Sequence, residues 1–140
     1  MTIRSRLASV LRARKAQEDI ARGEVARANA RLADAGELTV ERAGAMERWA
    51  VPRNGDAAGY LAAVAAGRAL ASALYEARTQ EDAAREISET EVDKLREAAR
   101  RRRSVEKLVE RGVEERRVKD LAAEQRAADE VGSRRRGDDR

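Results

Sequence analysis

The side chains best suited to chemistry are two neighbouring carboxylates, Glu114 and Glu115, and a run of four arginines at residues 100–103. Paired carboxylates act as general acid and base when a pocket separates their proton affinities. Glu114 and Glu115 stand in a strongly charged stretch that offers no apolar pocket. We therefore interpret them as part of a solvated helix face.

Other signatures of catalysis and metal binding are missing from the sequence. The chain has no histidine and no cysteine, which excludes the usual zinc sites, disulfides and histidine-activated nucleophiles. It also has no phosphate-binding loop of the Gly-x-x-x-x-Gly-Lys-Ser/Thr or Gly-x-Gly-x-x-Gly type. The sequence predicts a protein that is not an enzyme and that has no cofactor and no metal site.

The arginine run could neutralise the phosphates of a nucleic acid. Glu97 and Glu106 flank it, however, and no aromatic side chains are interleaved with it for base stacking. Four consecutive helical residues also point all around the helix axis rather than along one groove. The pattern favours a generic coiled-coil contact or an acidic protein partner over nucleic acid.

Long helices must position these residues. Of the 140 residues, 40% are charged and 2% are aromatic, and alanine is abundant, which is typical of coiled coils. One helix-breaking cluster, residues 51–56, contains the single proline, Pro52, and the turn dipeptide Asn54-Gly55. We expect an all-α fold in which two long helices form an antiparallel coiled-coil hairpin.

The hairpin is predicted to occupy residues 1–132, with helices at about 3–49 and 57–131 and a turn at 51–56. Thr2 and Asp56 are suited to cap the two helices, and Gly36 is expected to bend or end the first one. We expect Gly132 to end the second helix, so that residues 133–140 form a disordered basic tail. No strict heptad of large apolar residues persists beyond two turns.

The charge pattern predicts a register for the hairpin. If the chain reverses about residue 53, residue i lies opposite 106 − i, and the acidic residues 76–93 then face the basic residues 13–30. Residues 105–131 are left without a partner. Because they carry recurrent valines and leucines, we expect this basic, amphipathic segment to bind a partner.

At the closed end of the hairpin, Tyr60, Leu61 and Val64 either pack against Met46 and Trp49 or contact a partner. No apolar stretch approaches the ~20 residues of a membrane span without charged interruptions, and no signal peptide is recognisable. We expect a soluble, intracellular protein that is monomeric when free and does not insert directly into a membrane.

Three segments resemble the flagellar export protein FliJ family, the stalk of the flagellar type III export ATPase. Residues 6–14, Arg-Leu-Ala-Ser-Val-Leu-Arg-Ala-Arg, resemble the family's opening motif, and Tyr60-Leu61-x-x-Val64 resembles its segment beyond the turn. Glu106-Lys107-Leu108, with Glu124-Gln125-Arg126 and Asp129-Glu130 further on, is similar to its closing motif. Ser5, Gly112 and Ala127-Ala128 depart from the family pattern.

The resemblance implies a role in flagellum biogenesis, type III protein export and motility. The open end of the hairpin would enter the hexameric export ATPase, the closed end would contact the membrane export-gate protein, and export chaperones are possible further partners. The protein would then be cytoplasmic and peripheral at the inner membrane through the apparatus. The residues expected at the ATPase are Leu7, Val10, Leu11, Arg101, Arg102, Lys107, Leu108, Arg111 and Gln125, and those expected at the gate are Tyr60, Leu61 and Val64.

Two other functions stay open. The stripe of apolar residues at 105–121 could make this a structural coiled-coil protein that associates with itself, and the arginine run could belong to a nucleic-acid-binding helix.

Overall fold

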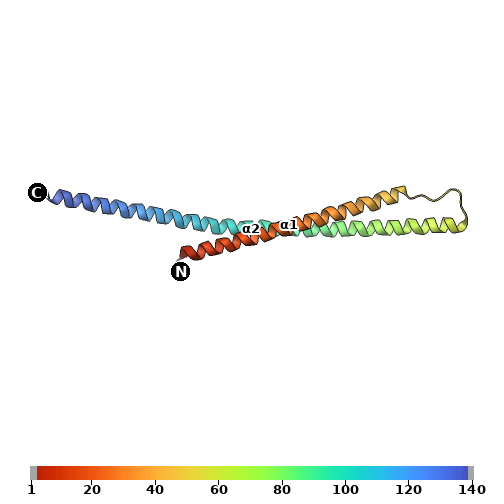
Figure 1. Ribbon diagram of the computed structural model, residues 1–140, viewed down its shortest axis with the longest axis horizontal. Helices are drawn as coiled ribbons and strands as arrows, with labels where there is room; N and C mark the ends of the chain where they lie inside the picture. Colours follow the sequence, from red (N-terminus) through yellow and green to blue (C-terminus); the bar gives the residue numbers. More distant parts are fainter. Residues whose placement is uncertain (1–2, 139–140) are drawn as a thin grey trace. The chain divides into compact units, whose positions relative to one another are not determined.

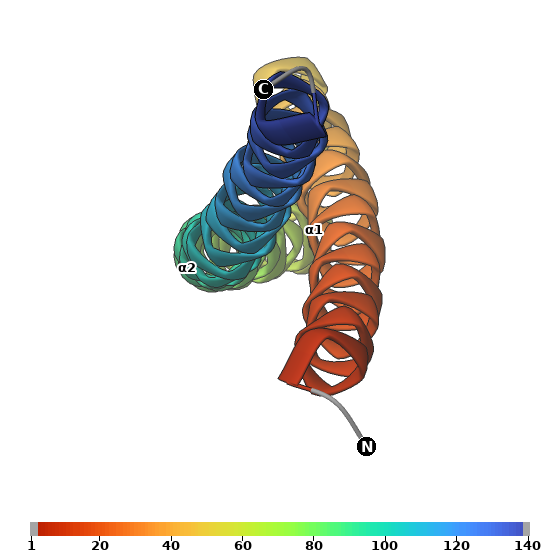
Figure 2. The same cartoon turned by 90° about the vertical axis from the view of Figure 1, so that its left-hand side faces the viewer.

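The protein folds into two helices, α1 (Ile3–Arg48) and α2 (Ala57–Asp138), in a computed structural model that describes residues 3–138. The helices have 46 and 82 residues and pack against each other as a helical hairpin (Figure 1). Figure 2, which looks along the helices, shows each of them as one uninterrupted ribbon. The predicted all-α hairpin is confirmed.

Residues 49–56 connect the helices in irregular structure, as the proline and the turn dipeptide predict. Asp56 caps α2: its Oδ1 accepts a hydrogen bond from the Gly59 amide at 2.8 Å, and its carbonyl accepts one from the Tyr60 amide at 3.1 Å. The side-chain bond satisfies an amide that the first helical turn leaves without a partner, and the bond from Tyr60 is the first regular backbone bond of the helix. Thr2, the expected cap of α1, lies outside the described residues.

Neither Gly36 nor Gly132 ends its helix. α1 continues through Gly36, and α2 continues through Gly132 to Asp138, so the helix extends into the segment where the sequence predicts a tail. A glycine in a helix lowers its stability by about 1 kcal/mol relative to alanine. The neighbouring turns of the helix offset this loss. After Gly132, the Ser133 hydroxyl donates to the Glu130 carbonyl at 2.9 Å, and Arg134 pairs with the Glu130 carboxylate at 2.6 Å.

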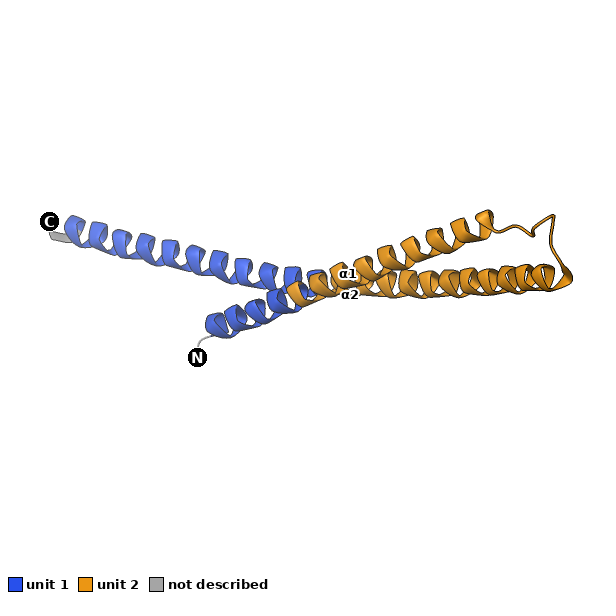
Figure 3. Ribbon diagram, turned by 45° about the vertical axis from the view of Figure 1, so that its right-hand side comes forward, with its two compact units in different colours: residues 1–18, 98–140 blue, residues 19–97 orange. Residues whose placement is uncertain are grey.

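The chain divides into two compact units (Figure 3). Unit 1 combines Met1–Glu18 with Ala98–Arg140, and unit 2 is the continuous segment Asp19–Glu97. Within each unit, part of α1 lies beside part of α2. Unit 2 contains the loop, and unit 1 contains the start of α1 and the end of α2.

Both helices contribute an unbroken heptad seam, which includes many small and charged residues beside the large apolar ones. Every residue of this seam is buried or half-buried, and the spacing alternates strictly between three and four residues. On α1 the seam comprises Leu7, Leu11, Arg14, Glu18, Ala21, Val25, Ala28, Leu32, Ala35 and Thr39. On α2 it comprises Ala63, Gly67, Leu70, Leu74, Ala77, Glu81, Ala84, Ser88, Glu91, Leu95, Ala98, Arg102, Val105 and Val109.

The contacts across the seam correct the predicted register. In unit 2 the Ser88 hydroxyl donates to Asn29 Oδ1 at 2.6 Å, and in unit 1 the Arg102 guanidinium donates to Glu18. The numbers of the contacting residues therefore add up to 117–120 rather than 106. The prediction was wrong because it assumed a tight reversal, whereas the loop runs on past the end of α1 before α2 begins (Figure 1).

The corrected register changes which charges meet. With a sum of 117, the acidic residues 76–93 face residues 24–41, which carry four acidic and two basic side chains. Charge complementarity therefore does not explain the pairing in unit 2. The segment of α2 beyond the start of α1 is also shorter than predicted, because residues 109–120 still line a groove with Ile3 and Leu7.

By length and composition alone, α2 is the one helix of the described residues that could cross a membrane. It contains a stretch with a mean hydropathy of 1.4, of which 11% is buried. This finding differs from the expectation, drawn from the sequence, that no apolar stretch is long enough to span a membrane. Apolar residues in the first part of α2 also serve helix packing, since Ala63, Leu70 and Leu74 belong to the seam.

Candidate partner-binding site

Unit 1 concentrates positive charge. Residues 3–18 of α1 and 98–120 of α2 together contain fourteen basic and six acidic residues, whereas unit 2 contains eleven basic and fifteen acidic ones. Basic segments of both helices thus lie together in unit 1, and their summed charges make the electrostatic potential at its surface positive. A surface of this kind favours an acidic partner.

A buried ionic cluster, formed by Glu18, Arg102 and Glu106, joins the two helices of unit 1. Glu18 is only 5% exposed, and its carboxylate accepts a hydrogen bond from Arg102 Nε at 2.6 Å. The same guanidinium donates to Glu106 at 2.6 Å. The hydrogen bond to Glu18 raises the pKa of Arg102 above its ordinary value, against the opposing effect of burial. We call these three residues the Glu18 latch.

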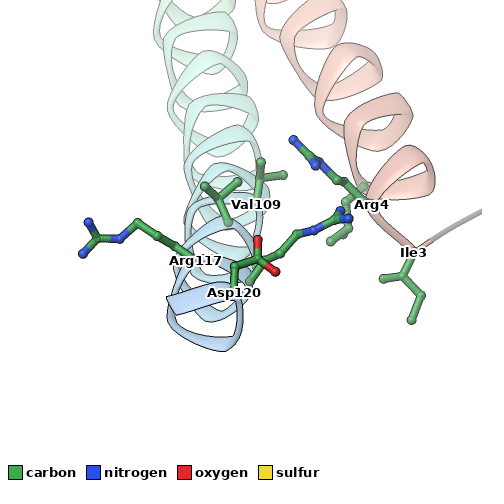
Figure 4. A pocket seen from close by; sticks show the side chains of 9 residues that line it. Ile3, Arg4, Val109, Arg117 and Asp120 are labelled. Atoms are coloured by element: carbon green, nitrogen blue, oxygen red, sulfur yellow. The ribbon is translucent and has the colours of Figure 1, made fainter. Parts of the chain in front are cut away.

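A groove lies between the first turns of α1 and the middle of α2, all within unit 1 (Figure 4). Its volume is about 520 Å³, and Ile3, Leu7, Val109 and Val113 give it apolar walls. The remaining lining residues are Arg4, Gly112, Arg116, Arg117 and Asp120. We call it the Gly112 groove. A Cβ placed on Gly112 would meet no atom within 4 Å.

The nine residues expected at the ATPase all belong to unit 1, but they differ in how accessible they are. Leu7 lines the groove and Leu11 is half-buried in the seam, whereas Val10 is 42% exposed. Arg102 is engaged in the Glu18 latch. The exposed members are Arg101, Lys107, Leu108, Arg111 and Gln125.

The three residues expected at the gate lie in unit 2, near the start of α2. Tyr60 and Leu61 are 57% and 66% exposed, while Val64 is half-buried. The large aromatic contact here belongs to Trp49, whose indole nitrogen donates to the Ala63 carbonyl at 2.9 Å. Its ring lies against Gly67, where a Cβ would come within 2.5 Å of Trp49 Cζ2.

Sequence reasoning missed the Glu18 latch, the Gly112 groove and the packing of Trp49 on Gly67. Each depends on the register between the helices, which was set about eleven residues wrong. The sequence does contain a pattern that points to the latch. Glu18 and Arg102 each lie three or four residues from an alanine or valine of the seam, as residues on one helix face do. In the part of the chain that the structure describes, no cluster of residues that could hold a metal ion is found.

A comparison with protein-family models matches residues 3–138 to the family described as flagellar FliJ protein. The match covers nearly the whole chain, including the loop and both helices. No curated protein and no solved structure matches the chain.

Proposed function

Because the chain belongs to the FliJ family of flagellar proteins, we propose that it is the stalk of the flagellar export ATPase and enters the hexameric ring with unit 1. Membership of the family makes the chain a component of the flagellar export apparatus, with its partners in that apparatus. The family is one of structural rather than enzymatic components. Beyond this, we propose that the export ATPase is the partner and that unit 1 is the part of the chain that binds it.

The strongest support for unit 1 as the ATPase-binding part is the difference in charge between the two units. Unit 1 has an excess of basic residues up to residue 120, and unit 2 has an excess of acidic ones. Arg101, Lys107 and Arg111 are exposed there, and we propose that they face acidic segments lining the ATPase pore. Arg102 serves the hairpin instead, since Glu18 and Glu106 already occupy its guanidinium.

Unit 2 is proposed to contact the membrane export-gate protein. Tyr60 and Leu61 support this part, because they expose large side chains beside the loop. Tyrosine combines apolar area with a polar tip and is favoured at protein interfaces. Export chaperones are proposed as further partners, and the protein is proposed to lie at the cytoplasmic face of the inner membrane through these contacts.

Reversing three exposed charges tests the assignment of unit 1. The triple variant Arg101→Glu, Lys107→Glu, Arg111→Glu is expected to lose co-purification with the flagellar export ATPase, because repulsion replaces attraction at each site. Its helicity by circular dichroism should stay as in the wild type, since all three side chains are exposed.

The matched control is Arg42→Glu, Arg53→Glu, Arg78→Glu, which reverses three exposed charges in unit 2. It changes the net charge of the chain by the same amount, and it is expected to keep the ATPase bound. Retention of the ATPase by the unit 1 variant, or its equal loss from both variants, would refute the proposed position of the contact.

A further inference from the structure

Gly112 lines the groove at a position of the seam that has no side chain. The alternating spacing that brings Val105 and Val109 against α1 puts the next seam position at Gly112. In a coiled coil that position holds a knob that fills the hole opposite. A Cβ there would meet nothing within 4 Å, so the space belonging to the knob remains open.

The groove combines an apolar interior with a basic rim. Ile3 and Val113 are 78% and 52% exposed, so water reaches the apolar walls. Arg4 and Arg116 line the groove beside one acidic residue, Asp120, whereas Arg117 pairs with Glu114 at 3.3 Å and points away from the groove in Figure 4. Figure 4 shows Val109 on α2 across the groove from Ile3 and Arg4 on α1. The volume of about 520 Å³ falls in the range, roughly 300–1,000 Å³, of sites that bury small ligands.

These features select one kind of occupant. An aliphatic side chain would replace the water on the apolar walls, which is favourable in proportion to the area covered. Carboxylates beside it would meet the arginines of the rim, and electrostatic complementarity of this kind directs specific association. A second copy of unit 1 fits less well, because it would bring the same excess of basic residues to the rim.

We infer that the Gly112 groove is the anchoring site of unit 1 for its partner and that it receives an aliphatic side chain flanked by carboxylates. The inference rests on the proposed function, since the partner is the export ATPase. It adds that a central apolar anchor, surrounded by charge pairs, holds the ATPase, in the manner of an interface hot spot.

Filling the groove tests this inference. The variant Gly112→Leu places an aliphatic side chain of the protein itself in the space reserved for the partner. Leucine favours helix over glycine, and the position is open, so the hairpin should remain folded. Titration calorimetry with the purified flagellar export ATPase is expected to show binding at least about tenfold weaker than that of the wild type.

Gly132→Leu is the matched control, because it makes the same exchange in the same helix at another open position outside the groove. It is expected to bind the ATPase like the wild type. Equal affinities for the wild type and Gly112→Leu would overturn the groove inference and leave the proposed function standing. A wild-type chain that fails to bind would overturn both. If the exchange alters self-association in sedimentation instead, the occupant is a second copy of the chain and the inference is wrong.

Discussion

The variant Glu18→Lys is expected to lower the melting temperature by about 10 °C or more, because it sets two cations against each other in the Glu18 latch. Glu18 is 5% exposed and lies 2.6 Å from Arg102 Nε. Without Glu18, Arg102 would keep only Glu106 as its partner, and the lysine would add repulsion in a largely buried position. Thermal unfolding followed by circular dichroism measures the effect.

Charge rescue separates this ionic effect from a packing effect. The double variant Glu18→Arg, Arg102→Glu restores an opposite pair and is expected to recover most of the lost melting temperature. Glu24→Lys is the control for charge alone, since Glu24 pairs with Arg27 at the surface, where such pairs contribute little. Equal losses for Glu18→Lys and Glu24→Lys, or a double variant no better than Glu18→Lys, would show that the latch does not hold the helices together.

The second large effect is expected at the closed end. Gly67→Val should displace the Trp49 indole, since even a Cβ at this position would lie 2.5 Å from the ring. The free energy of unfolding is expected to fall by about 1–3 kcal/mol, as for other overpacked sites. Because Trp49 is the only tryptophan, its fluorescence emission should shift to longer wavelength as the ring enters water.

Ala66→Val is the neighbouring control for this experiment. It adds a similar branched side chain to α2, one residue before Gly67, at an exposed position. The emission of Trp49 should then stay unchanged. A Gly67→Val protein whose emission and stability equal those of the wild type would contradict the packing of Trp49 on Gly67.

The elements of this fold can be predicted from local sequence, but their register cannot. Pro52 and Asn54-Gly55 mark the loop, and Asp56 caps α2 as its residue type predicts. The register depends on how far the loop extends beyond α1, and the loop residues do not determine that distance. An error of eleven in the register reversed the expected charge complementarity of unit 2.

Only part of the candidate site can be predicted from the sequence, for a related reason. The basic character of unit 1 follows from counting arginines and lysines, and the exposed Arg101, Lys107 and Arg111 are found in this way. The heptad seam is hidden, because Ala28, Ser88 and Glu81 occupy positions where a search for large apolar residues expects leucine. Unless the seam is recognised, Gly112 is interpreted as a residue that weakens the helix rather than as a seam position without a side chain.

The small residues of the seam also determine how the stability of the hairpin depends on temperature. The buried apolar residues of the described part of the chain are Ala28, Leu74 and Ala77, two of them alanines. The heat capacity of unfolding increases with the apolar area that becomes exposed, and alanine contributes little of it. The stability curve of the free chain is therefore shallow, and its stability should vary less between cold and warm conditions than that of a globular domain of equal length.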